Sequence, residues 1–275
     1  MKLFACMCNQ PQRLSAALAP VRATLVAQPP VARWGLAYNH AGDVLLVRTP
    51  KASHTAVDLA APLLPSSSHQ PAEIATDCVI GQAVVADSAV ESPLGGTDNT
   101  PPFRFRRWMF AMSGRVATED VIPQLVEHIP EYLRRNIRGR TSAEMIFHVF
   151  LAMLHDEGNI DDPNLPVAAS RRALAATLRL VDAELEKAHK PPSLGNVALT
   201  NGRSMIFAHQ REPLRMRRLW VTDDRGERDP AFRGVIMLSG GDGESRDGFE
   251  DVPANNAVLV SRDLQVSFAT LEQAP

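Results

Sequence analysis

The chain begins with Met1-Lys2-Leu3-Phe4-Ala5-Cys6-Met7-Cys8, followed directly by Asn9-Gln10-Pro11. A short apolar run that ends at turn-forming residues predicts a β-strand. Side chains alternate along a strand, so Cys6 and Cys8 are expected on one face, pointing either into the space between two sheets or away from it. The sequence therefore predicts that the fold starts with a strand and a turn.

The elements outward from this strand follow from hydrophobic period and punctuation. Short strands are expected over residues 1–50, with a short helix over Pro11–Ala27 and a further strand at Cys78–Ala86. Apolar residues at intervals of three and four predict three helices, at Thr118–Tyr132, Ser142–Leu154 and Val167–His189. Strands are then expected at Val197–Thr200, Ser204–His209, Leu219–Val221, Val235–Leu238, Ala257–Val260 and Gln265–Phe268. This order predicts an α+β fold with helices outside two antiparallel sheets.

Composition places limits on the function. The 275 residues are 45% hydrophobic, which is enough for a large core, and we expect a single domain over 1–275. The formal net charge of −2 favours neither nucleic acid nor an anionic membrane as a partner. No apolar run approaches the roughly 18 residues that span a bilayer, and no signal peptide is evident. Three cysteines are too few for a disulfide scaffold, so we expect a cytoplasmic protein.

Four further motifs follow the opening strand in order. They are Trp34-Gly35-Leu36-Ala37-Tyr38, Asn99-Thr100-Pro101-Pro102-Phe103, Trp108-Met109-Phe110-Ala111-Met112-Ser113-Gly114 and Gly139-Arg140-Thr141-Ser142-Ala143-Glu144. Together with the opening strand, they resemble the class II glutamine amidotransferases of the stand-alone type, which have an N-terminal-nucleophile fold. The resemblance covers residues 1–150, and the rest of the chain matches only in pattern.

The resemblance implies a four-layer αββα sandwich and, for the family, hydrolysis of the glutamine amide with transfer of ammonia and no cofactor. Such enzymes attack with the thiol of an N-terminal Cys, whose own α-amino group is the base. Here Met1 or Lys2 falls at that position, and neither a thioether nor an ammonium can attack an amide carbon. The resemblance thus predicts that the nucleophile is absent.

The remaining catalytic and substrate positions also differ from the family pattern. The family's oxyanion-hole Asn corresponds to Ser113, although the following Gly114 is retained, and loss of one such donor costs about 10²–10³ in rate. The Arg that binds the substrate carboxylate corresponds to Ala89, and the Asp that binds the substrate ammonium corresponds to Ser142. The retained pocket positions, which also serve packing and turns, are Trp34, Gly35 and Glu144.

We therefore expect a non-catalytic amidotransferase-like protein that acts by binding, either as a subunit beside an active homologue or by self-association. Two alternatives remain open. One is a divergent amidohydrolase whose nucleophile has moved to Cys6 or Cys8, with His40, His54 or His148 as the base. The other is a sensor for a small molecule less zwitterionic than glutamine.

Metal and ion sites are not expected from the sequence. The ligand-type residues lack paired Cys-x-x-Cys or His-Glu-x-x-His spacing; they are Cys6, Cys8, Cys78, Glu144, His148 and His155. The segment Gly240–Ser245 is interpreted as a loop rather than a calcium or phosphate site. The arginines at 211, 215, 217 and 218 are interpreted as charges on an exposed strand edge.

Overall fold

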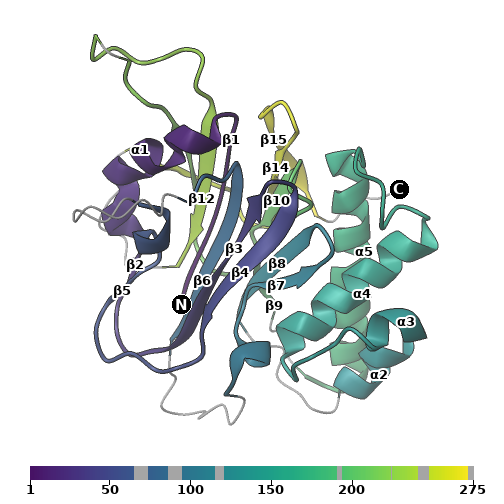
Figure 1. The fold of residues 1–275 in the computed structure, drawn as a ribbon. Helices are drawn as coiled ribbons and strands as arrows, with labels where there is room; N and C mark the ends of the chain where they lie inside the picture. The colour runs from purple at the N-terminus through teal and green to yellow at the C-terminus, as the bar shows by residue number, and fades with distance from the viewer. Residues whose placement is uncertain are drawn as a thin grey trace.

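The computed structural model describes residues 1–64, 74–85, 95–114, 121–190, 194–223, 225–240 and 248–271. Two large antiparallel sheets face each other, and helices cover the outer face of each sheet (Figure 1). The predicted α+β fold with four layers is confirmed. None of the described helices combines the length and the apolar character needed to cross a bilayer.

The first sheet has seven strands in the order β13-β11-β12-β1-β6-β3-β4. Its strands are β1 (Lys2–Cys8), β3 (Val31–His40), β4 (Asp43–Thr49), β6 (Cys78–Val85), β11 (Leu214–Leu219), β12 (Gly234–Ser239) and β13 (Glu250–Asp251). The opening strand β1 lies in the middle, where Cys6 pairs with Ile236 of β12 on one side and Val79 of β6 on the other. The start of the chain is therefore held on both sides by strands that come much later.

The second sheet has six strands in the order β15-β14-β10-β9-β8-β7. Its strands are β7 (Phe103–Phe105), β8 (Trp108–Gly114), β9 (Leu194–Thr200), β10 (Met205–Ala208), β14 (Asn256–Val260) and β15 (Val266–Thr270). A separate two-stranded sheet joins β2 (Val26–Ala27) to β5 (Val57–Asp58). The strand β4 ends the first sheet and β7 ends the second, so both have a free edge.

Alternation along β1 divides its side chains between two cores. Leu3, Ala5 and Met7 belong to the core between the two sheets. Cys6 and Cys8 belong to the core between the first sheet and the helices that cover its outer face. The expected placement of both thiols on one face is confirmed, and that face points away from the space between the sheets.

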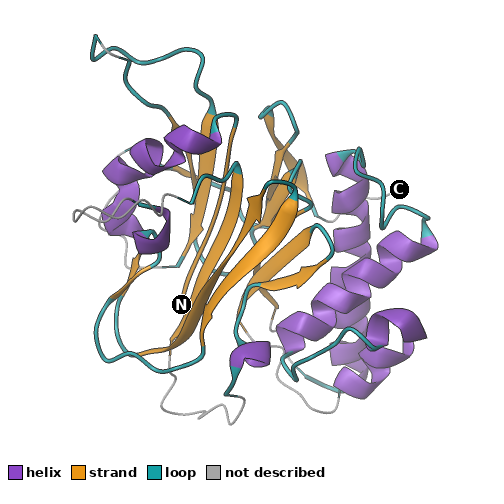
Figure 2. Ribbon diagram, in the orientation of Figure 1, coloured by secondary structure: helices purple, strands orange, loops and turns teal. Residues whose placement is uncertain are grey.

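The helical layers differ in size (Figure 2). The second sheet is covered by α4 (Ser142–Asp156) and α5 (Val167–Lys187). Two aromatic pairs join β8 to α4: Trp108 contacts Phe150 edge to face, and Phe110 stacks on Phe147, each pair with centroids 5.2 Å apart. The first sheet is covered by shorter elements, namely η1 (Pro11–Arg13), α1 (Leu14–Leu18), η2 (Ala19–Leu25) and η3 (Ala61–Leu63).

Two expected helices are shorter than predicted because prolines interrupt them. The helix expected over Pro11–Ala27 gives way to 3₁₀ turns around α1, with Pro20 at the start of η2. The helix expected over Thr118–Tyr132 is two helices, α2 (Ile122–Glu127) and α3 (Glu131–Arg134), which Pro130 separates. Thr118 itself lies outside the described residues.

The arginine-rich segment is a correction to the predicted strand at Leu219–Val221. The strand is β11, which ends at Leu219, and it pairs with β12 on one side and with the short β13 on the other. Arg217 places its guanidinium 4.6 Å from the centre of the Trp220 ring. Arg215 forms an ion pair with Asp251 of β13 at 3.4 Å. Of these arginines only Arg215 is paired with β13, and Arg217 and Arg218 follow in β11 beyond that two-residue pairing.

Candidate functional site

The amino-terminal end of β1 is the position at which the resemblance places a nucleophile. The Met1 sulfur lies 3.4 Å from Gln82 Nε2, and the same amide group donates to the Met112 carbonyl oxygen at 2.7 Å. Lys2 points to the opposite face, where its ammonium donates to the Thr24 carbonyl oxygen at 2.7 Å. This end of the strand thus presents a thioether to the space between the sheets and an ammonium to the outer helical layer.

Ser113 occupies a bulge where β8 pairs with β9, between the paired residues Met112 and Gly114. Gly114 has φ +83°, a left-handed conformation that glycine adopts without strain. The Ser113 side chain is fully buried, and its hydroxyl oxygen accepts the Asn196 N–H at 2.9 Å. The Ser113 hydroxyl oxygen therefore joins β8 to β9 within the sheet.

Asn196 is the best-connected polar residue at this end of the sandwich, and sequence reasoning missed it. Its side-chain amide donates to the Glu212 carbonyl oxygen at 2.6 Å and to the Ser239 hydroxyl at 2.8 Å, while its oxygen accepts the Gln210 N–H at 2.7 Å. The pair Gly195-Asn196 is typical of a turn, which hid its place in strand β9. A fully buried asparagine with these partners joins both sheets.

The retained motif residues also serve the scaffold. Gly35 passes so close to neighbouring strands that a Cβ there would lie 2.6 Å from the Pro101 carbonyl oxygen and 2.7 Å from that of Val47. The preceding Trp34 is partly buried and packs on the core under the first helical layer. Arg48 Nε donates to the Pro102 carbonyl oxygen at 3.1 Å. Two of the sequence motifs, those around Gly35 and Pro101, are thus brought together by backbone packing beside β4.

The Glu144 side chain binds back to the loop that precedes α4. Its carboxylate accepts the Arg138 N–H at 2.9 Å and the Gly139 N–H at 2.7 Å, and its own N–H donates to Thr141, the N-cap of α4, at 3.2 Å. Ser142, the position expected to face a substrate ammonium, is the first helical residue. Ala89 lies outside the described residues.

Burial raises the pKa of Glu144 above its ordinary value of 4.5, against the opposing influence of the two N–H donors. A carboxyl whose pKa is raised by folding contributes stability to the protein at low pH. That contribution is lost as pH rises from the ordinary pKa through the raised one. We expect the unfolding free energy of the parent, relative to that of Glu144→Gln, to fall as pH rises from 4 to 7. Urea titrations at several pH values would measure this difference.

Glu186 is exposed near the end of α5, so Glu186→Gln is the matched control for that experiment. The difference in unfolding free energy between Glu186→Gln and the parent should change little with pH. A parent that gains stability relative to Glu144→Gln as pH rises would contradict the raised pKa.

The three thiols are free and buried. Burial raises the pKa of Cys6 well above its ordinary value, raises that of Cys8 to about 12, and raises that of Cys78 further. The Cys8 thiol lies 3.6 Å from the Gln10 carbonyl oxygen, and Cys78 lies 3.3 Å from the Thr200 hydroxyl. A nucleophilic cysteine ordinarily has the opposite shift and an accessible sulfur.

The ligand-type residues considered for a metal do not come together. Within the described ranges, no group of three or more His, Cys, Asp or Glu residues is placed to hold a metal ion. His148 is buried, its Nδ1 lies 2.8 Å from the Glu144 carbonyl oxygen, and burial lowers its pKa. His155 packs edge to face against Tyr132 instead.

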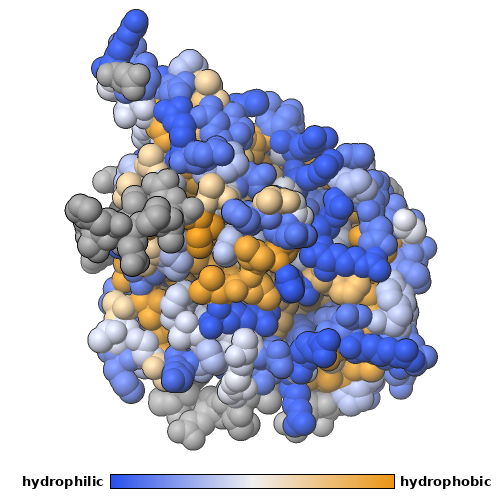
Figure 3. Space-filling view, in the orientation of Figure 1, coloured by the Kyte–Doolittle hydropathy of each residue, from blue (hydrophilic) through white to orange (hydrophobic). Residues whose placement is uncertain are grey.

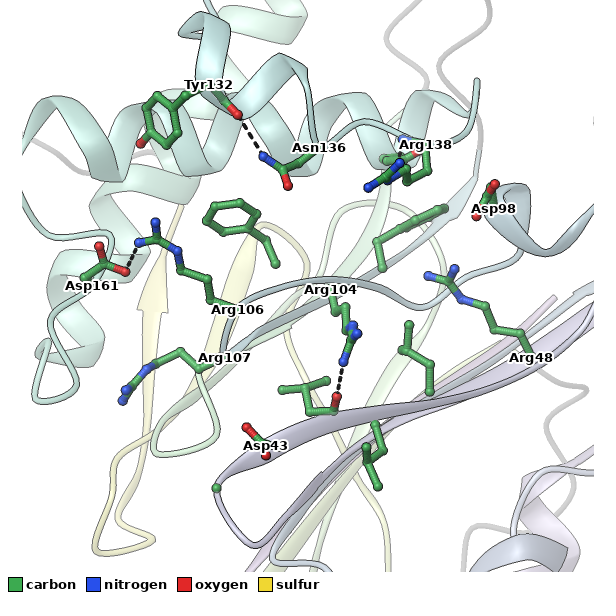
Figure 4. A pocket seen from close by; sticks show the side chains of 17 residues that line it. Asp43, Arg48, Asp98, Arg104, Arg106, Arg107, Tyr132, Asn136, Arg138 and Asp161 are labelled. Atoms are coloured by element: carbon green, nitrogen blue, oxygen red, sulfur yellow. Dashed lines mark hydrogen bonds and ion pairs between the residues drawn. The ribbon is translucent and has the colours of Figure 1, made fainter.

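A second candidate region is a cleft of about 950 Å³ along the free edges of β4 and β7 (Figure 4). Five arginines line it: Arg48 from β4, Arg104 from β7, Arg106 and Arg107 from the turn before β8, and Arg138 from the loop before α4. Four carboxyl groups also line it, those of Asp43, Asp98, Glu144 and Asp161. This cleft was not predicted, because its residues are spread along the sequence from Gly42 to Asp161.

No family model matches the chain, and no curated protein matches it. Solved structures do match. A glutamine aminotransferase class-II domain protein from Silicibacter pomeroyi has TM-score 0.58 at 16% identity, with 100% of both chains covered. A predicted glutamine amidotransferase from Pseudomonas aeruginosa has TM-score 0.57 at 15% identity, covering 97% of this chain and 99% of the other.

The glutamine phosphoribosylpyrophosphate amidotransferase from B. subtilis has TM-score 0.54 at 10% identity. All of this chain is covered, but it spans only 50% of that longer protein. At these identities the likeness establishes the fold. The chain shares with these solved structures the fold of two facing antiparallel sheets between helical layers.

Proposed function

We propose that this chain is a non-catalytic protein of the class II amidotransferase fold, which acts by binding. The observation that carries the proposal is the chemistry at the start of β1. Met1 contributes a thioether beside Gln82, and the Lys2 ammonium is engaged by the Thr24 carbonyl oxygen, so neither supplies a nucleophile. In this fold the attacking group would have to lie there.

Two further observations support the loss of catalysis. Ser113 stands where the resemblance places the oxyanion-hole Asn, and its shorter side chain is buried with the hydroxyl oxygen bonded to the Asn196 N–H of β9. The described cysteines are buried and have raised rather than lowered pKa values, which is the opposite of what an activated thiol needs. Both observations favour a non-catalytic chain.

The partner we propose is a second chain of the same fold, either an active homologue or another copy, and we propose a cytoplasmic location. The edge strand β15 supports the idea of association, because an unpaired edge can receive a further strand. Purification from the native source would show a homologous subunit in stoichiometric amount, or a mass in solution above that of one chain. A monomer without a partner would contradict this part of the proposal.

We expect no glutaminase activity and no covalent adduct with a glutamine-like diazoketone. The reagent alkylates a nucleophile that is already activated, and the thiols here are protonated and buried. Intact mass spectrometry before and after incubation would measure the adduct, and released ammonia would measure hydrolysis. An active class II amidotransferase treated in parallel is the positive control.

A stoichiometric adduct on Cys6 or Cys8 would sink the proposal. Cys6→Ser and Cys8→Ser would then identify the modified residue. In that case the divergent amidohydrolase would become the better description of the chain.

A second candidate function, a small-molecule sensor, is favoured by one observation. The arginine-lined cleft is large, and Met1, Gln82 and Ser113 are not among its lining residues, although Glu144 is. Binding of a small molecule in this cleft would therefore not require a nucleophile at the start of β1.

A further inference from the structure

The cleft runs along the edges of β4 and β7, and Tyr132 of α3 and Asn136 line another side of it. Leu45 of β4 and Tyr132 supply exposed apolar surface, with 39% and 38% of the residue exposed, whereas Val44, Phe103 and Phe105 also line the cleft but are largely buried. Figure 3 shows hydrophobic surface in the middle of this face, with hydrophilic surface around it. A ligand in the cleft would therefore meet apolar side chains as well as charges.

Two of the five arginines are committed to the protein. Arg106 forms an ion pair with Asp161, and its guanidinium lies 5.1 Å from the centre of the Phe105 ring. Arg48 donates to the Pro102 carbonyl oxygen and lies 5.5 Å from the centre of the Phe103 ring. These contacts hold the Arg106 guanidinium over the Phe105 ring and the Arg48 guanidinium over the Phe103 ring.

The other three arginines retain donors for a ligand. Arg104 bonds the Val44 carbonyl oxygen through one guanidinium nitrogen, which leaves its remaining N–H groups available. In the part of the chain that the structure describes, the Arg107 and Arg138 side chains have no hydrogen-bond or ion-pair partner, and both line the cleft. Cationic donors outnumber the acidic groups opposing them, because Asp161 pairs with Arg106.

The carboxyl groups do not cancel this surplus. Glu144 is occupied by two backbone N–H groups, and in Figure 4 Asp43 lies below Arg104 while Asp98 lies at the upper right. Arg104 lies between them in that view, near the middle of the cleft. The centre of the cleft is therefore suited to an anionic group.

The occupant that fits best is a small molecule. An extended peptide added along β4 would have to displace Arg104, which reaches across from β7 to the Val44 carbonyl oxygen. The volume of about 950 Å³ lies within the range of small-molecule and cofactor sites. Planar guanidinium groups bind phosphate and carboxylate through paired N–H donors.

We propose that this cleft binds a small organic anion, in which a phosphate or carboxylate group is attached to a flat apolar body. The acidic group would lie between Arg104 and Arg138, and the apolar body would rest on the side chains of β4 and β7. This binding does not require the chain to be non-catalytic. The ligand titration tests the cleft, whereas the diazoketone reaction tests the start of β1.

The test uses three probes with the same ring system: 2-naphthyl phosphate, 2-naphthoate and neutral 2-naphthol, titrated into the full chain by calorimetry. We expect at least one of the two anions to bind roughly tenfold or more tightly than the neutral probe, because charge-assisted hydrogen bonds form only with the anions. Arg104→Gln and Arg138→Gln should each weaken that binding by roughly tenfold. Arg172 is exposed on α5, so Arg172→Gln is the matched control and should leave binding unchanged.

The pattern across the anions identifies the ligand class. Binding of the phosphate alone, of the carboxylate alone, or of both would each support the site and name its preferred group. Equal binding of 2-naphthol, no binding of any probe, or binding that survives both cleft substitutions would overturn the proposal. Circular dichroism of each variant would verify that it is folded. Arg104→Gln and Arg138→Gln are independent variants, so the test can still be made with one of them if the other does not fold.

Discussion

Replacing Asn196 by alanine is expected to lower the free energy of unfolding by about 3–5 kcal/mol, a large fraction of the stability of an ordinary domain. The change removes a fully buried amide that bonds the Glu212 carbonyl oxygen and the Ser239 hydroxyl and that accepts the Gln210 N–H. Each buried partner left without a hydrogen bond costs about 1–3 kcal/mol. Chemical denaturation monitored by tryptophan fluorescence would measure the loss.

The control for this variant is Asn159→Ala. Asn159 makes one exposed hydrogen bond, to Glu157 at 3.0 Å, and its removal should change the unfolding free energy by less than about 0.5 kcal/mol. Equal effects of the two substitutions would contradict the central role of Asn196. An Asn196→Ala protein that cannot be obtained folded, beside a normal Asn159→Ala protein, would agree with the expected direction.

The parts of the fold that could be predicted are those with a strong local period. The helix α4 repeats apolar residues at intervals of three and four, and its structure begins at the predicted Ser142. The strand β1 is a short apolar run with a turn after it, and alternation correctly placed Cys6 and Cys8 on one face. In both cases the pattern reflects which face of the element is buried, so neighbouring residues carry the information.

The helices that broke were less predictable because two local signals compete. The apolar spacing around Leu125 and Ile129 continues across Pro130, and proline, which lacks an N–H, ends the hydrogen-bonded run there. The strand β11 was placed too late in the chain because its alternate arginines conceal the buried Leu214 and Met216. Exposed charge on one face is compatible with a strand, but it weakens the apolar signal.

The candidate site was predicted only where a residue is recognisable without its partners. Met1 carries a thioether and Lys2 an ammonium whatever surrounds them, so the absence of a thiol at these positions could be read from the sequence alone. Asn196 and Gln82 could not be found, because a buried amide has meaning only through the groups it bonds. The arginine cleft is likewise created by bringing β4, β7 and the loop before α4 together, and no local stretch contains it.

Gly195→Ala is expected to be the most damaging single substitution in the described β9 strand. A Cβ at this position would lie 1.7 Å from the Ser113 carbonyl oxygen and 2.3 Å from the Ser113 carbonyl carbon. Those atoms are backbone, so no rotation of a side chain can relieve the overlap. The bulge at Ser113 brings the two backbones together, which is a common reason for glycine inside a strand.

Relief of the overlap requires β8 and β9 to separate at the point where Gly114 pairs with Leu194 and where Ser113 accepts the Asn196 N–H. We expect a loss of about 3 kcal/mol or more in unfolding free energy, measured as a lower denaturant midpoint, or a chain that does not accumulate folded. The matched control is Gly95→Ala, because a Cβ at Gly95 has no atom within 4 Å, and its effect should stay within about 0.5 kcal/mol. A Gly195→Ala protein as stable as its Gly95→Ala counterpart would show that β8 and β9 do not meet as closely as described, and the contact between Ser113 and Asn196 would have to be reconsidered.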